Sequence, residues 1–180
     1  MADEQTENQT NQATAGNQGN QGIQGNQRQL VMQRIYIKDL SFESPRAPAI
    51  FTVNPQPETQ LNMRSSTNDL GDDNVEVVLT LTVESKADDQ TMFLVELSQA
   101  GIFLIKGFSS EEKGALITSY CSNALYAFAR EAISDVVMKG GFPQLLLQPI
   151  NFDALYAQAM REREQNLAEA SPRQGAGESH

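Results

Sequence analysis

The sequence predicts an α+β fold in which a four-stranded antiparallel sheet is followed by two helices. From Val75 to Val83, inward apolar residues alternate with outward, mostly polar ones, the period of a strand with one buried face. From Ser109 to about Lys139, apolar residues instead recur at helical spacing. The strand-like segments all precede the helix-like ones, which is typical of folds that segregate helices from an antiparallel sheet.

The two ends of the 180-residue chain are predicted to lie outside the folded domain. Residues 1–29 are dominated by Asn, Gln, Gly and Thr, and residues 168–180 by small and polar side chains. Such segments cannot bury enough apolar surface to offset the entropy that ordering costs. We therefore expect a disordered tail over 1–29, one domain over 30–167 and a flexible tail over 168–180.

The first strand is expected from Arg34 to Glu43. Because side chains alternate along a strand, Asp39 and Glu43 should share one face. The opposite face should carry three apolar or aromatic residues, Tyr36, Leu40 and Phe42.

A crossing loop should follow this strand, because four prolines interrupt both helix and continuous ladder bonding. It carries a short apolar insert, Ile50 and Phe51; the prolines are Pro45, Pro48, Pro55 and Pro57. A second strand is expected over residues 59–66, with Leu61 and Met63 on one face. The sequence GDDN at residues 71–74 predicts a turn and therefore a hairpin.

The third and fourth strands should together present an acidic surface. Residues 86–90 make the turn between them, and the fourth strand places Phe93, Val95 and Leu97 on one face and Leu94 and Glu96 on the other. If the outward faces lie on one side of the sheet, that side carries several carboxylates, Asp39, Glu43, Glu76, Glu84 and Glu96. Antiparallel sheets commonly bury one face and solvate the other.

Two helices complete the predicted fold. Ser109 and Glu112 have the spacing of a capping box, and Gly140 with Gly141 should end the long helix. Asn151 is placed to cap the last helix. The long helix has more apolar surface than contact with one sheet requires, so part of it is expected to meet another subunit.

Composition excludes several classes of partner and site. With 13 Lys and Arg against 23 Asp and Glu, the net charge of −10 disfavours nucleic acid and anionic membranes. The single Cys and the single terminal His exclude a disulfide framework and a Cys/His zinc site within one chain. The sequence shows no signal-peptide pattern and no apolar run long enough to insert into a membrane. We expect a cytoplasmic protein.

Catalysis is not expected either. The predicted domain contains no His to activate a nucleophile, and Cys121 lies in an apolar helical run that is typical of a buried thiol. The paired carboxylates at residues 72–73 and 88–89 are better explained by turns than by acid/base work or metal binding. We therefore predict no enzyme, no cofactor and no metal site.

Four segments resemble the SecB family of bacterial export chaperones. They are QRIYIKDLSFESPRAP from Gln33, EVVLTLTVES from Glu76, FLVELSQAGIF from Phe93 and GGFPQLLLQPINFDALY from Gly140. Their order and spacing are similar to those of the family across nearly all of the predicted domain.

The resemblance implies a homotetramer, built as a dimer of dimers, that works without ATP. Such a chaperone holds unfolded preproteins and delivers them to SecA, the motor ATPase of the Sec translocase. The family docks the basic tail of SecA on an acidic sheet face, for which the matching positions here are Asp39, Glu43, Leu94 and Glu96. The competing interpretation of these residues, a face that is merely solvated, stays open on charge alone.

The resemblance also implies an apolar groove for extended client segments. We carry the groove over to seven positions, Ile50, Phe51, Leu61, Met63, Phe93, Val95 and Leu97. From the sequence alone these residues are most simply core. The alternative function is a SecB-like chaperone that serves a toxin-antitoxin system or another single client, and retention of the docking residues favours the export role.

Overall fold

The computed structural model describes residues 27–53 and 56–170, which include a single four-stranded sheet. The strands are β1 (Gln29–Glu43), β2 (Glu58–Gly71), β3 (Asn74–Ala87) and β4 (Gln90–Lys106), in the spatial order β1-β4-β3-β2. All neighbours pair antiparallel. β1 and β2 are thus opposite edges of the sheet, so the connection between them crosses from one edge to the other, as predicted. It contains a short 3-10 helix, η1 (Ala49–Thr52).

Each strand is longer than its sequence pattern predicted. The predicted second strand ended at residue 66, whereas β2 continues to Gly71 and pairs with β3 up to Asp69 and again at Gly71. Polar residues 65–69 do not alternate with apolar ones, so only the pairing reveals them as strand. At the ends, β1 begins at Gln29 and the last helix continues to Ala170, so regular structure extends slightly beyond the expected 30–167. The remainder of both expected tails lies outside the described residues.

The two predicted hairpin turns are confirmed. Asp72 and Asp73 have φ angles of 52° and 62°, and Asp88 and Asp89 have φ angles of 50° and 58°. Positive φ at both central residues defines a type I′ turn, whose twist matches that of the flanking strands. Both aspartate pairs therefore have a structural explanation, as predicted.

A β-bulge in β1 corrects one predicted face. The pairing with β4 steps from Ile37↔Gln99 directly to Asp39↔Ser98, which leaves Lys38 as an extra residue. The bulge reverses the alternation, so Tyr36 lies on the same face as Asp39 and Glu43 rather than opposite them. Leu40 and Phe42 pair with Leu97 and Val95 on the other face, as predicted.

The predicted long helix forms with a local irregularity. It comprises α1 (Ser110–Leu116), a π-helical segment η2 (Ile117–Cys121) and α2 (Ser122–Lys139), which follow one another without a break. Ser109 and Glu112 form the reciprocal capping box, and Gly140 is the C-cap residue of α2. The last helix, α3 (Phe152–Ala170), begins where the Asn151 side chain accepts a hydrogen bond from the Ala154 amide at 2.9 Å.

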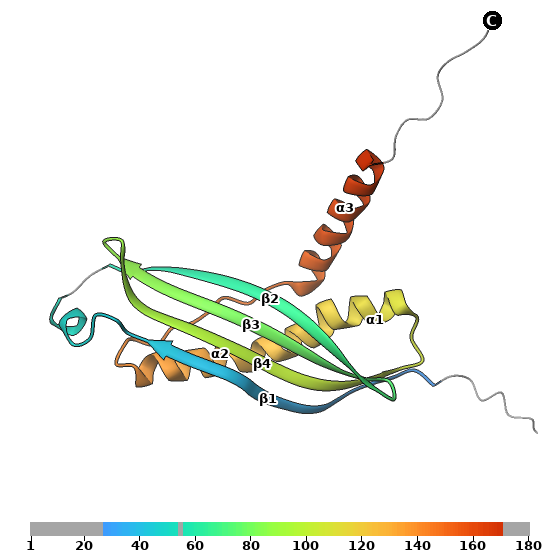
Figure 1. Cartoon of the computed structure of the whole chain (residues 1–180), viewed down its shortest axis with the longest axis horizontal. Helices are drawn as coiled ribbons and strands as arrows, with labels where there is room; N and C mark the ends of the chain where they lie inside the picture. The colour runs from blue at the N-terminus through green and yellow to red at the C-terminus, as the bar shows by residue number, and fades with distance from the viewer. Residues whose placement is uncertain (1–26, 54–55, 171–180) are drawn as a thin grey trace, which may run out of the picture.

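The core lies between one face of the sheet and α2. This inner face carries Val77, Leu79, Leu81, Val95 and Leu97, none of them more than 1% exposed. The apolar side of α2 packs against it through four residues that are 0% exposed, Leu125, Ala129, Ile133 and Val137. Figure 1 shows α1 and α2 lying along the sheet while α3 projects away from it. The other, outer face is the one that carries the predicted carboxylates.

Candidate functional site: two faces of one sheet

The register brings the four predicted docking residues together on the outer face. Glu43 pairs with Leu94, Ser41 with Glu96 and Asp39 with Ser98, in three alternate cross-strand rows of β1 and β4. Directly paired residues point to the same side of a sheet. Asp39, Glu43, Leu94 and Glu96 therefore form one surface, which we call the docking face.

The carboxylates of the docking face remain accessible to a partner. Asp39 and Glu43 are exposed, and in the described part of the chain neither forms an ion pair. The Glu96 side chain is 45% exposed, with an Arg64 guanidinium nitrogen 3.7 Å from its Oε1. A pair this long and this exposed contributes little stability and is readily exchanged for another cation.

Glu76 does not belong to the exposed acidic surface that the sequence predicted. It is outward-facing but only 7% exposed. Its carboxylate accepts hydrogen bonds from the Tyr36 hydroxyl, from Asn68 Nδ2 at 2.6 Å and from Lys38 Nζ at 2.8 and 2.9 Å. The Lys38 ammonium and these donors lower the pKa of Glu76 to about 2, against a burial effect in the opposite direction. Alternation predicted its face correctly, but its partners come from two other strands.

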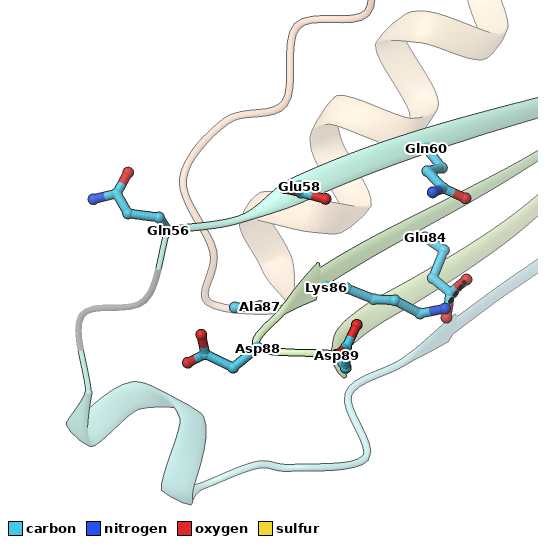
Figure 2. Close-up of a pocket in the computed structure, with 8 residues that line it drawn as sticks. All are labelled: Gln56, Glu58, Gln60, Glu84, Lys86, Ala87, Asp88 and Asp89. Atoms are coloured by element: carbon cyan, nitrogen blue, oxygen red, sulfur yellow. Dashed lines mark ion pairs between the residues drawn. The ribbon is translucent and has the colours of Figure 1, made fainter.

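A polar hollow of about 430 Å³ lies beyond the docking face, where β2 begins and β3 ends (Figure 2). Glu84, which pairs with Leu94, and Glu58 contribute carboxylates to it, and the Asp88–Asp89 turn closes one end. Lys86 Nζ lies 3.0 Å from Glu84 Oε2, so one of these charges is already neutralised. The lining contains no convergent set of catalytic groups.

The seven predicted groove residues fall into two groups according to their exposure. Ile50, Phe93, Val95 and Leu97 are at most 5% exposed, so in this structure they are core. Phe51 is 49% exposed, and Leu61 and Met63 are half-buried. The partners of Leu61 and Met63 across the ladder, Val83 and Leu81, are both 0% exposed. The inner face is therefore covered over β3 but partly open along β2.

An aromatic cluster connects the crossing loop to the end of α2. The Phe142 ring lies 5.1 Å from that of Phe51 and 4.9 Å from that of Phe93, and Phe42 stacks 6.1 Å from Phe93. Such pairs contribute beyond the area they bury. A Cβ on Gly140 would lie 2.1 Å from the Phe42 ring, so only glycine permits this approach. Phe142 was not singled out from the sequence as a member of this cluster, although its position just after the helix-ending glycines was a signal.

Apolar residues remain exposed on the helical side as well. Tyr120 and Phe128 are 49% and 46% exposed, and Met138 is 46% exposed. The predicted surplus of apolar helix surface is therefore present. These three side chains are therefore available for contact with another molecule.

In the part of the chain that the structure describes, the titratable groups do not converge on a catalytic centre. Cys121 is 0% exposed, and burial raises the pKa of its thiol to about 12, which keeps it protonated and unreactive. Within residues 27–53 and 56–170, no three His, Cys, Asp or Glu side chains are grouped so that they could hold a metal ion. Over the same ranges, no helix combines the length and apolar character needed to cross a membrane.

Comparison with known proteins identifies close relatives over most of the chain. Residues 23–163 match the family described as preprotein translocase subunit SecB. The chain is 47% identical to the protein-export protein SecB of Methylococcus capsulatus, over 81% of this chain and 94% of that protein. It is 51% identical to the SecB of Nitrosococcus oceani, over 77% of this chain and 85% of that protein.

A solved structure shares the fold. It is a SecB-like chaperone of Mycobacterium tuberculosis in complex with a peptide from an antitoxin, and it superposes with a TM-score of 0.58 at 16% identity. The alignment covers 67% of this chain and 90% of that chain.

Proposed function

The chain belongs to the SecB family and is a protein-export chaperone, and we propose that it holds unfolded preproteins without ATP and delivers them to SecA. The observation that carries this proposal is the separation of two surfaces on one sheet. The docking face gathers accessible carboxylates around an apolar residue, Leu94, while apolar side chains are accessible on the inner side. One surface suits a basic partner and the other an unfolded client.

The docking face is proposed to bind the basic tail of SecA. Carboxylates that lack a close counterion attract a cationic segment and orient it, and an apolar spot among them adds burial once the segment has docked. Asp39, Glu43 and Glu96 supply the charge, and Leu94 supplies the apolar contact. Because Leu94 and Glu43 are direct cross-strand partners, one docked side chain can contact both.

The client surface is proposed to lie along β2 and the crossing loop. Phe51, Leu61 and Met63 are the groove positions with accessible surface. Leu61 and Met63 pack against the core that contains the four buried positions, Ile50, Phe93, Val95 and Leu97. Burial of apolar surface stabilises by about 25 cal/mol per Å² whatever the client sequence. A site that relies on such burial accepts many preproteins.

The chain is proposed to assemble as a dimer of dimers. The exposed residues Tyr120, Phe128 and Met138 on the helical side support association, since such residues favour burial against another subunit. Several client surfaces on one tetramer would hold one long preprotein with greater avidity than a single surface. We further propose that residues 30–167 form the chaperone domain, that the protein acts in the cytoplasm and that it catalyses no reaction.

The experiment that tests the proposal reverses charge on the docking face. In the variant Asp39→Lys with Glu96→Lys, SecA affinity should fall by about 100-fold, because like charges then face the basic tail and such juxtaposition costs several kcal/mol. Titration calorimetry with purified SecA measures the loss. Suppression of aggregation of an unfolded preprotein should stay within about twofold of the unaltered chain, since the inner face is untouched.

A matched control reverses two carboxylates far from the docking face. Glu111→Lys with Asp153→Lys makes the same change in net charge on the helices and should leave SecA affinity nearly unchanged. Sedimentation should report four chains for the unaltered protein and for both variants. Equal loss of SecA and client binding in the docking-face variant would refute two separate surfaces.

The alternative of a chaperone dedicated to one antitoxin-type client is less well supported. The SecB-like chaperone of Mycobacterium tuberculosis, whose structure contains an antitoxin peptide, shares the fold at only 16% identity. The relatives at 47% and 51% identity are named protein-export proteins.

A further inference from the structure

The bulge that positions the docking carboxylates coincides with a charged network on the same face. Lys38 is the extra residue of the bulge, and its ammonium lies 2.8 and 2.9 Å from the two carboxylate oxygens of Glu76. Tyr36, two residues earlier, donates its hydroxyl proton to the same carboxylate. Both side chains come from β1, whereas Glu76 belongs to β3.

These contacts span a whole strand, because β4 lies between β1 and β3. Two strand spacings amount to about 9–10 Å, which only long side chains cross. The residue of β4 opposite Tyr36 is Ala100, whose small side chain leaves room above the sheet, and it is 0% exposed. Tyr36, Lys38 and Glu76 thus form a clamp from the edge strand to a central strand.

The clamp matters because β1 is an edge strand, paired on one side only. Without the bulge, the side chains after Ile37 would alternate in the opposite phase, and Asp39 and Glu43 would face the core. Ile35 and Ile37, before the bulge, pair with inner-face positions of β4. Ile35 packs against the core, whereas Ile37 is 48% exposed at the sheet edge. An inward Ile35 is compatible with outward carboxylates at residues 39 and 43 only if one extra residue lies between them, which here is Lys38.

We propose that Glu76 is a positioning residue for the docking face: through Lys38 and Tyr36 it holds the bulge that points Asp39 and Glu43 toward SecA. This inference rests on the proposed docking of SecA and adds residues that do not touch it. The lowered pKa of Glu76 supports the clamp, since the carboxylate stays ionised and paired with Lys38 at any physiological pH.

The variant Lys38→Met tests the clamp against simple electrostatics. Removal of a positive charge beside Asp39 makes the face more acidic, so electrostatics alone predicts tighter binding of a basic partner. Loss of the clamp predicts the opposite. If the outward arrangement falls to a tenth to a third of the population, the apparent SecA affinity decreases by about three- to tenfold. Calorimetry with purified SecA distinguishes the two directions.

Two further variants isolate the connection to β1. Glu76→Gln removes the same ion pair from the other side and should weaken SecA binding by a similar factor. The double variant Lys38→Met with Glu76→Gln should be no weaker than the single variants, because both belong to one unit. Amide hydrogen exchange should quicken at residues 36–40 in all three.

Matched controls keep the clamp to β1 intact. Asn68→Ser removes only the hydrogen bond from β2 to Glu76, and Glu58→Gln removes an outer-face carboxylate without contact to β1. The SecA affinity of both should stay within about twofold of that of the unaltered chain. The affinity for an unfolded client should stay within the same limit in every variant.

The outcomes separate this inference from the proposed function. If Lys38→Met binds SecA as tightly as the unaltered chain or more tightly, or if Asn68→Ser loses as much as Glu76→Gln, the positioning role is overturned. If charge reversal at Asp39 and Glu96 has no effect, the docking assignment itself fails. If charge reversal lowers SecA affinity strongly but the clamp variants do not, only the positioning role of Glu76 is refuted.

Discussion

The two faces of the sheet come from the same four strands but differ in what determines exposure. On the inner face, α2 covers β3 and β4, and exposure increases toward both edge strands. On β2, Met63 and Leu61 are half-buried beside Leu81 and Val83 at 0%. On β1, Leu40 is 39% exposed and Ile37 is 48% exposed. On the outer face, exposure depends on side-chain partners: Glu96 remains accessible, whereas Glu76 is buried under donors from β1 and β2. Packing determines which inner residues are accessible, and electrostatic pairing determines which outer carboxylates are.

The comparison also explains how one small domain can serve two partners. In the proposed function, a client that buries apolar surface and a partner that neutralises carboxylates use opposite sides of the sheet, so the two need not compete for the same atoms. Changes confined to one face should therefore affect one activity. The variants below test this independence, from the largest expected effect to the smallest.

The largest effect is expected from Phe142→Ala on the inner face. Phe142 is 8% exposed and its ring contacts those of Phe42, Phe51 and Phe93. Truncation of a buried phenylalanine leaves a cavity and should lower the free energy of unfolding by about 3–5 kcal/mol. Urea unfolding at fixed protein concentration measures the change. A loss below about 1 kcal/mol would mean that the aromatic cluster is not a packed unit.

A smaller effect, dependent on pH, is expected from Glu76→Gln on the outer face. The folded pKa of Glu76, about 2, lies below its ordinary value of 4.5, so the ionised carboxylate stabilises the fold above pH 4.5. This stabilisation is lost as pH falls from 4.5 through 2. The groups that bond to it are Tyr36 and Lys38 from β1 and Asn68 from β2. In the same cross-strand row, β4 contributes the apolar Ile102 and β1 contributes Arg34.

We expect Glu76→Gln to lower the free energy of unfolding by about 2 kcal/mol at pH 7, with allowance for the partial exposure of Lys38. The difference from the unaltered chain should shrink as the pH approaches 2. Urea unfolding at several pH values measures it. A difference that is constant with pH would show that the carboxylate charge is not what stabilises the network.

The smallest effect on stability is expected from Phe51→Ser in the crossing loop. Because Phe51 is 49% exposed, the free energy of unfolding should fall by only about 1 kcal/mol. Affinity for an unfolded preprotein should nevertheless fall by about three- to tenfold, since the ring offers accessible apolar area. Fluorescence titration measures the affinity for the preprotein, and the SecA affinity is measured alongside it. Leu70→Ser, at the other end of β2 and 52% exposed, is the matched control and should bind preprotein normally.

Much of the local structure could be predicted because short-range signals determine it. The capping box at Ser109, the glycines at 140 and 141, the Asn151 cap and the two aspartate turns each depend on a few neighbouring residues. Alternation likewise assigned Leu94 and Glu96 to the outer face correctly, because β4 has no bulge there. The length of β2 was underestimated, since its polar end is a strand only through pairing with β3.

By itself, the sequence determined the α+β class, the turns and caps, and the face on which most strand residues lie, because these depend on local conformation and a period of two. Only the tertiary structure decided that Tyr36 shares the face of Asp39, that Glu76 is buried by Lys38 and Asn68, and that Phe93 is core while Leu61 is partly accessible. The physical reason is the same in each case. Register, ion pairing and burial depend on which strand or helix becomes the neighbour, and these neighbours are distant in the sequence.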